Sequence, residues 1–207
     1  MLSIGKLGKG QERYYLDKVA EGAEDYYSGE GEAEGQWIGQ VAKDLGLEGV
    51  VEADQLTAML TGKNPATGEP LGLRAVGGRG AVPGFDLTFS VPKSASLLWA
   101  LADKETSAAV TAAVEASLKA ALGYMEREAC WTRRGAGGAE FVKGSGFLAA
   151  AYRHRSSRNG DPQVHVHTLS RTRPRDQTAN GPASTTRRST TTPRRPGISS
   201  RRTSARS

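Results

Sequence analysis

The sequence predicts a protein that combines β-strands with helices, and three segments carry this prediction. Residues 85–91 alternate apolar and polar side chains, as a strand with one buried face does. Residues 94–129 are rich in alanine and repeat larger apolar residues at helical spacing. Residues 163–169, QVHVHTL, alternate again. A chain of 207 residues, 37% of them hydrophobic, can bury a core between such elements.

Short strands and helices are predicted for the first part of the chain. Residues 2–8 suggest a strand, and residues 11–27 a helix that a central glycine weakens. An acidic, glycine-rich linker follows at 28–35. Apolar residues recur every four positions over 36–47, which predicts a helix. A second short helix is expected over 53–61.

The remaining elements are bounded by turn-forming residues. Residues 62–84 are rich in glycine and turn formers and predict loops. Pro92 ends the strand at 85–91, and the helical pattern at 94–129 is expected to break near Asp103. The segments after it are a predicted hairpin, CWTRR and AEFVKG around a glycine-rich turn, then strands at 146–154 and 163–169 separated by a loop, SSRNGDP.

Charge and composition change abruptly after Leu169. Residues 1–169 carry 18 basic and 21 acidic residues, whereas residues 170–207 carry ten arginines and one aspartate. In this second segment 25 of 38 residues are Arg, Ser or Thr, and the large apolar residues are reduced to one isoleucine. Such a composition cannot bury enough apolar surface to offset the entropy of ordering. We therefore expect a folded part over 1–169 and a disordered tail over 170–207.

Several classes of protein are excluded by composition. The chain has no apolar run of 18 residues, which excludes a membrane-spanning helix, and its N-terminus lacks the apolar stretch of a signal peptide. A single cysteine excludes a disulfide framework and any zinc site built on paired cysteines. These features favour a cytoplasmic protein.

All three histidines fall within 14 residues, at His154, His165 and His167. Residues i and i+2 of a strand point to the same face, so His165 and His167 are expected side by side. His154, on a neighbouring antiparallel strand, could join them and complete an open metal site of three imidazoles. The alternative is a chance cluster of polar strand residues.

A carboxylate and four phenols complete the set of candidate residues. Asp86 lies on the polar face of its strand, where it is either solvated or hydrogen-bonded to a metal-binding histidine. Tyrosines occur as two adjacent pairs, Tyr14-Tyr15 and Tyr26-Tyr27. They either pack as ordinary helix residues or present a nucleophile for phosphoryl transfer, whose developing charge a nearby cation would stabilise.

In this order, four segments resemble the TrwC/TraI-type conjugative relaxases, the MobF family of HUH endonucleases. They are the two tyrosine doublets in YYLDKVAEGAEDYY, then GQWIGQVAKDLGLEG, FDLTFSVPKSAS and HRSSRNGDPQVHVHTL. The resemblance covers the chain from Met1 to about Leu169. It implies an α+β fold with an antiparallel, palm-like sheet flanked by helices, incomplete at the C-terminus.

The resemblance also implies an activity. A tyrosine would attack a phosphodiester of single-stranded DNA at a transfer origin, forming a 5′-phosphotyrosyl link and leaving a free 3′-OH. A divalent metal, Mg²⁺ or Mn²⁺, would be held by the three histidines and would polarise the scissile phosphate. Other relaxosome and conjugation proteins would be partners.

The same resemblance suggests roles for individual residues. Tyr14 would be the first nucleophile and Tyr26 the second, with Tyr15 and Tyr27 as their neighbours. Asp86 would orient a histidine or accept the tyrosine proton. The residues expected to contact phosphates are Lys93, Arg155 and Arg158.

The tail does not resemble the family, and a shifted reading frame explains its composition. Read one base earlier, serine TCN codons become codons for apolar residues, and arginine CGN codons become codons for small residues. Applied from Ser184, synonymous codons allow LDDAALYHHAKTAGYLFQAHLRA, which looks like the family's continuation. The tail is therefore expected to be out-of-frame translation on a truncated relaxase. The alternatives are an inactive remnant that only binds single-stranded DNA, a non-functional fragment of a mobile element, and a genuine basic arm.

Overall fold

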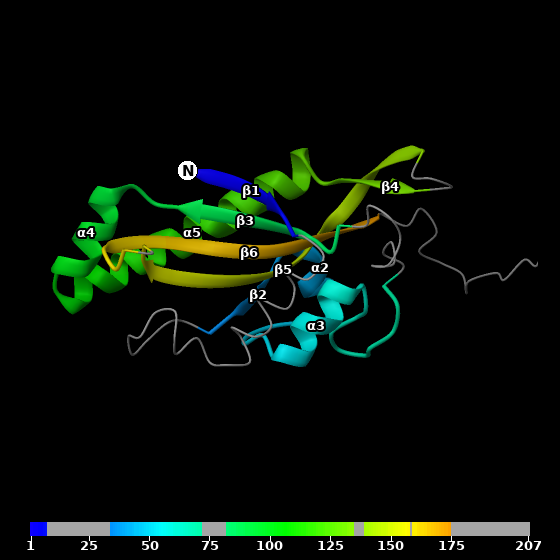
Figure 1. Ribbon diagram of the computed structural model, residues 1–207, viewed down its shortest axis with the longest axis horizontal. Helices are drawn as coiled ribbons and strands as arrows, with labels where there is room; N and C mark the ends of the chain where they lie inside the picture. Colours follow the sequence, from blue (N-terminus) through cyan, green and yellow to red (C-terminus); the bar gives the residue numbers. More distant parts are fainter. Residues whose placement is uncertain (8–33, 72–81, 135–138, 158, 175–207) are drawn as a thin grey trace, which may run out of the picture. The chain divides into compact units, whose positions relative to one another are not determined.

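The computed structural model describes residues 1–7, 34–71, 82–134, 139–157 and 159–174, which form an antiparallel sheet with helices on both faces (Figure 1). The strands are β1 (Leu2–Lys6), β2 (Gln36–Ile38), β3 (Phe85–Ser90), β4 (Trp131–Arg134), β5 (Glu140–Ser156) and β6 (Pro162–Pro174). The helices are α2 (Gln40–Asp44), α3 (Ala53–Thr61), α4 (Lys93–Leu101) and α5 (Lys104–Glu128). The predicted helix at 11–27 lies outside the described residues. No helix within the described ranges is long and apolar enough to cross a membrane.

The sheet has the order β1-β3-β6-β5-β2, and β4 pairs with the first part of β5. Every pairing is antiparallel. The predicted antiparallel sheet is thus confirmed, although the two segments expected at 139–144 and 146–154 form one continuous strand, β5. Because β6 lies between β3 and β5, it is hydrogen-bonded to a neighbouring strand on both sides.

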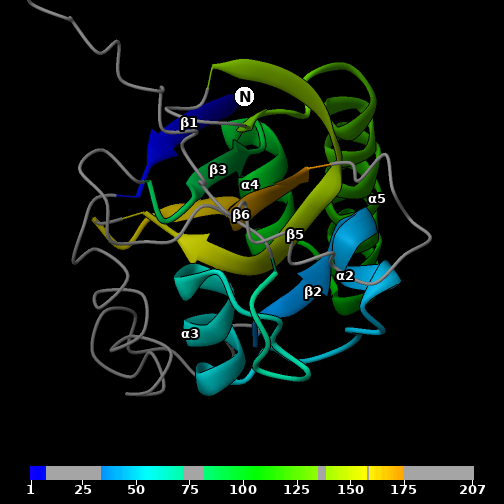
Figure 2. The same ribbon diagram turned by 90° about the vertical axis from the view of Figure 1, so that its right-hand side faces the viewer.

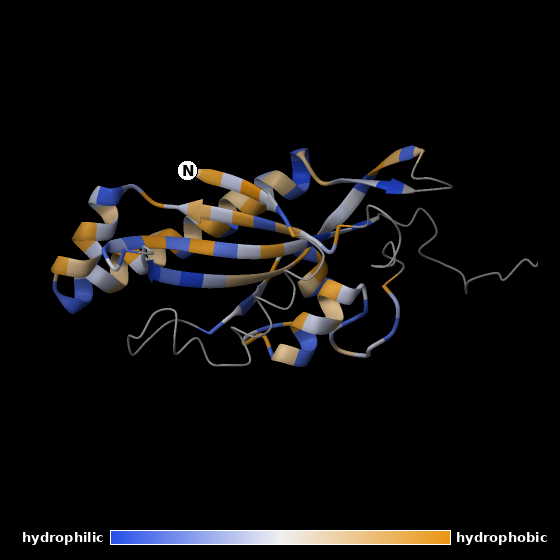
Figure 3. Cartoon of the chain, viewed as in Figure 1, coloured by the Kyte–Doolittle hydropathy of each residue, from blue (hydrophilic) through white to orange (hydrophobic). Residues whose placement is uncertain are grey.

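The two faces of the sheet bury different helices. Hydrophobic and polar residues alternate along the central strands (Figure 3). On one face Leu87, Val166 and their neighbours pack against α5. On the other face Leu148 and Leu169 pack with Leu56 and other apolar residues of α3 and α2. Figure 2 shows α5 and α3 on opposite sides of the sheet.

The helix predicted over 36–47 is wrong in its first turn. Residues Gln36–Ile38 form β2, which pairs with β5, and α2 begins only at Gln40. Gly39 separates the two with a φ of 101°, and a Cβ there would lie 2.3 Å from the carbonyl oxygen of Phe147. Only glycine fits that close approach, so the chain turns from strand to helix at this residue.

The predicted break near Asp103 is confirmed. Helix α4 ends at Leu101 and α5 begins at Lys104. Asp103 is the N-cap of α5, and its Oδ1 accepts a hydrogen bond of 2.8 Å from the backbone N–H of Thr106. Helix α5, which covers one face of the sheet, therefore begins at its own N-cap residue.

Strand β6 continues past Leu169, where the ordered part of the chain was expected to end. It runs to Pro174, with Ser170 1% and Arg171 7% exposed. The Arg171 guanidinium donates hydrogen bonds of 3.2 and 2.6 Å to the carbonyl oxygens of Met59 and Leu60, in the last turn of α3. The polar composition indicated disorder, but pairing with β5 and this helix contact hold residues 170–174 in the sheet. Residues 175–207 lie outside the described residues.

Candidate metal centre on the central strands

The three histidines lie together on the face of the sheet that α3 only partly covers. His154 on β5 pairs directly with His165 on β6, and His167 follows two residues later on β6. The ring centroids are 5.3 Å apart for His154 and His165, 5.2 Å for His154 and His167, and 5.1 Å for His165 and His167. Strand pairing and strand alternation thus bring all three imidazoles to one place.

The ring spacing fits three imidazoles around one divalent ion. A metal–nitrogen bond of about 2.1 Å puts a ring centroid about 3.2 Å from the ion, and two such rings about 4.6–5.3 Å apart. The donor set suits a transition-metal ion, because imidazole binds most of these metals, whereas Mg²⁺ prefers oxygen ligands. Among the described residues, no three ligating side chains already close on one point as a finished site. The spacing of the three rings therefore fits such an ion, although the side chains do not form a closed set of ligands.

Asp86 on β3 holds the ring of His167. The distance from its Oδ2 to His167 Nδ1 is 2.8 Å, and Thr88 Oγ1 lies 3.3 Å from the same nitrogen. With the carboxylate as acceptor, Nδ1 carries the proton and Nε2 keeps its lone pair. Asp86 therefore sets the tautomer that a metal ligand needs.

His165 is oriented by its own strand. Its Nδ1 lies 2.8 Å from the backbone carbonyl oxygen of Gln163, so this nitrogen is the donor and Nε2 again keeps its lone pair. Burial lowers the pKa of His165 below its usual range, and the nearby His167 lowers it further, although the Gln163 contact opposes the shift. The ring is therefore neutral near pH 7, the form that binds metal.

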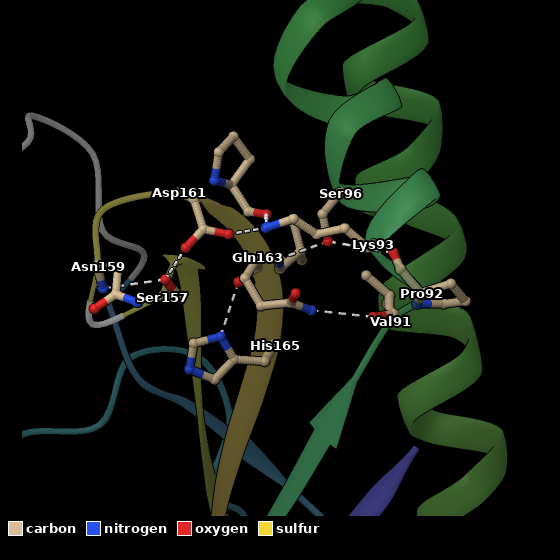
Figure 4. A network of polar contacts seen from close by, with 11 residues as sticks. Val91, Pro92, Lys93, Ser96, Ser157, Asn159, Asp161, Gln163 and His165 are labelled. Atoms are coloured by element: carbon tan, nitrogen blue, oxygen red, sulfur yellow. Dashed lines mark hydrogen bonds and ion pairs between the residues drawn. The ribbon is translucent and has the colours of Figure 1, made fainter.

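A polar network fixes the turn that leads into the histidine strand (Figure 4). Lys93, at the start of α4, forms an ion pair with Asp161 and donates a 2.7 Å hydrogen bond to the carbonyl of Pro162. The Gln163 amide donates to the carbonyl of Val91 over 3.1 Å. The segments VPKSAS and NGDPQVHVH are thus joined side by side. Lys93, expected to contact phosphate, is engaged with the protein here.

Ser96 supplies the buried member of this network. It is 0% exposed, and its Oγ accepts a 2.9 Å hydrogen bond from the backbone N–H of Val164. Ser96→Ala would leave that N–H without its acceptor, so we expect the free energy of unfolding to fall by about 1–3 kcal/mol in chemical denaturation. Ser94→Ala is the matched control, because Ser94 is exposed on the same helix. Equal stability of the two variants would contradict the role given to Ser96.

Tyr152 is a residue that the sequence interpretation missed. It pairs with His167 across β5 and β6 and therefore shares the face of the histidines. Burial raises the pKa of its phenol far above the usual range. A Cβ on Gly35 would lie 2.4 Å from its ring, so the chain passes directly over it. Its position two residues before His154 in a strand was the available signal.

The other predicted residues are distributed as follows. Tyr14, Tyr15, Tyr26, Tyr27 and Arg158 lie outside the described residues. Arg155 is described, and its guanidinium carbon lies 5.8 Å from the centroid of the Trp99 ring. The structure thus brings together the three histidines and Asp86 among the predicted residues.

The antiparallel sheet with its flanking helices is the fold of the conjugative relaxases. A structure of the conjugative relaxase TrwC in complex with oriT DNA, in its metal-bound form, matches with a TM-score of 0.63 and 28% identity, over 84% of this chain and 61% of that chain. A TrwC complex with a 27-mer DNA comprising the recognition hairpin and the cleavage site gives a TM-score of 0.57 at 26% identity, over 84% and 59% of the two chains.

The chain belongs to the TrwC relaxase family, whose model matches residues 8–191. It is 34% identical over 168 residues to the multifunctional conjugation protein TraI of Escherichia coli, a match that covers 81% of this chain and 9% of that protein. The chain therefore spans a small part of this relative's length. The family match also extends beyond Leu169, where the resemblance was expected to stop.

Proposed function

We propose that this chain performs the DNA-nicking reaction of a conjugative relaxase on single-stranded DNA at a transfer origin. One observation carries the proposal. Three imidazoles lie with ring centroids 5.1–5.3 Å apart on central strands, and a carboxylate lies 2.8 Å from one of them. Structural relatives that hold oriT DNA and a metal support it.

The reaction is an exchange of phosphoester bonds. The hydroxyl oxygen of Tyr14 attacks the scissile phosphorus, a bond from phosphorus to the phenol oxygen forms, and the bond to the 3′ oxygen breaks. The phenol proton ends on the departing 3′ oxygen, through solvent or a base. Tyr26 serves the second transfer by the same chemistry. One ester bond replaces another, so no oxidant or co-reactant is required.

The described residues have a supporting role in this scheme. His154, His165 and His167 hold a divalent ion, Mg²⁺ or Mn²⁺, which when bound neutralises charge on the scissile phosphate. Asp86 orients His167, because its Oδ2 lies 2.8 Å from His167 Nδ1. Tyr15 and Tyr27 are the sequence neighbours of the two nucleophiles.

A covalent adduct tests the proposal. The full chain is incubated with labelled single-stranded DNA spanning the transfer origin of its own genetic element, with Mn²⁺ or Mg²⁺ present. We expect a DNA–protein adduct that survives denaturing electrophoresis and is at least about 100-fold weaker in Tyr14→Phe, since the attacking group is lost. Tyr124→Phe is the matched control, because Tyr124 lies on α5 and is 60% exposed.

Two outcomes would contradict this scheme. An adduct that persists when Tyr14, Tyr15, Tyr26 and Tyr27 are all replaced would exclude the assigned nucleophiles. Salt-sensitive binding of single-stranded DNA without any adduct, at every metal concentration, would instead identify a remnant that binds DNA and does not cut it.

A further inference from the structure

Strand β4 and the first residues of β5 form a two-stranded ribbon, the β4–β5 ribbon, at one end of the sheet (Figure 1). Trp131 pairs with Lys143, and Arg133 pairs with Phe141. Paired residues of antiparallel strands share a face, and so do residues two apart. These four side chains therefore occupy one face, here called the ribbon face, whereas Glu140 belongs to the other.

The ribbon face exposes aromatic rings and cations together. Trp131 is 54% and Phe141 63% exposed. The guanidinium carbon of Arg133 lies 4.2 Å from the centroid of the Phe141 ring, within the range of a cation–π contact. Two large aromatic side chains that are this exposed on one strand pair are unusual for a folded surface. Proteins bind single-stranded nucleic acid with aromatic rings that stack on the bases and with neighbouring cations that contact the phosphates.

Further cationic side chains lie beside Lys143, at the end of the ribbon that joins the sheet. A cavity of about 660 Å³ adjoins Lys143, and Lys43, Lys119 and Arg127 also line it. Glu48 and Glu126 also line the cavity, so its four cations outnumber its two carboxylates. Glu126 Oε1 accepts hydrogen bonds from the backbone N–H groups of Gln40 and Phe147, at 2.7 and 2.9 Å. The surface beside the ribbon therefore keeps an excess of positive charge.

We propose that the ribbon face is a second binding surface for single-stranded DNA, separate from the histidine centre. Bases stack on Trp131 and Phe141, while Arg133 and Lys143 contact phosphates. His154 follows Lys143 by eleven positions along β5, which corresponds to at most about 35 Å in an extended strand. The ribbon thus holds DNA away from the scissile phosphate. This inference rests on the proposed function, because it takes single-stranded DNA as the ligand.

Fluorescence anisotropy of a labelled oligo(dT), measured with the full chain in EDTA, tests the inference. Trp131→Ala and Phe141→Ala are each expected to weaken binding by about 5-fold or more, because one stacking platform is lost. Trp131→Phe keeps a ring and is expected to restore most of the affinity. Thr132→Ala, on the opposite face of the ribbon, is the matched control, and thermal unfolding verifies that each variant is folded. Photo-crosslinking of oligonucleotides containing 5-iododeoxyuridine should label Trp131 or Phe141.

The outcomes separate this inference from the proposed function. Unchanged affinity in both alanine variants, no oligo(dT) binding by the unaltered chain, or crosslinks confined to residues outside the ribbon would each overturn it. Because EDTA removes the metal, binding here does not depend on catalysis. If oligo(dT) binding depends on Trp131 and Phe141 but no covalent adduct forms in the nicking assay, the ribbon face is a DNA-binding surface and the proposed nicking activity is wrong.

Discussion

Replacing His167 by alanine is expected to abolish metal binding at the histidine centre and, with it, formation of the DNA adduct. The ring is one of three imidazoles whose centroids lie 5.1–5.3 Å apart, and the two that remain give a much weaker site. Isothermal titration with Mn²⁺ measures the loss directly. A second measurement is thermal unfolding, because an ion at 100 times its dissociation constant stabilises the native state by about 2.7 kcal/mol.

Asp86→Asn tests the supporting contact separately from the ligands. The amide lacks the negative charge with which Asp86 Oδ2 accepts the proton of His167 Nδ1, 2.8 Å away between the two heavy atoms. We therefore expect metal affinity to fall by about 10- to 100-fold while the protein stays folded. Glu115→Gln is the matched control, because this carboxylate pairs with Arg153, away from the histidines. Unchanged Mn²⁺ affinity in Asp86→Asn would show that Asp86 does not tune the site. Unchanged affinity in His167→Ala would remove the histidine centre from the mechanism.

Much of this centre could be predicted because strand alternation is a local property. The pattern of His165 and His167 indicates a shared face without knowledge of the fold, and the alternation in FDLTFSV puts Asp86 on a polar face. The pairing of His154 with His165 and of Thr88 with His167 fixes which rings meet, and this register depends on the whole sheet. The spacing in the sequence therefore indicates which residues could form the centre, whereas the strand register brings their side chains together.

Two misread segments show where local patterns fail. The spacing of Trp37, Val41 and Leu45 is helical, yet Trp37 lies on β2, because Gly39 adopts a positive φ against the backbone of β5. The composition after Leu169 indicated disorder, yet Arg171 is buried. In both cases contacts with a segment distant in sequence determine the local structure. The periodicity of a short stretch of sequence carries no information about such contacts.

A chain shortened to end at Leu169 is expected to lose its cooperative unfolding transition, whereas a chain that ends at Asp176 should keep it. Residues 170–174 complete the central strand β6, where Thr172 pairs with Phe147 and Arg171 with Leu148. Their removal deletes ladder hydrogen bonds and exposes an edge in the middle of the sheet. The loss is comparable to the whole stability of a small domain, about 5–15 kcal/mol. Differential scanning calorimetry compares the two chains with the full one.

Arg171→Ala isolates the contribution of one buried side chain to this effect. The guanidinium donates to the carbonyl oxygens of Met59 and Leu60, at 3.2 and 2.6 Å, and burial lowers its pKa. Hydrogen bonds from a charged donor contribute about 1.5–3 kcal/mol. Without Arg171, the Leu60 carbonyl loses this donor, whereas the Met59 carbonyl keeps the backbone N–H of Gly62 at 3.0 Å, so we expect a loss of about 2–4 kcal/mol. Arg173→Ala, two residues on and only partly buried, should change stability by less than about 0.5 kcal/mol. If the chain ending at Leu169 unfolds like the full chain, or if the two arginine variants are equally stable, the sheet does not need the end of β6.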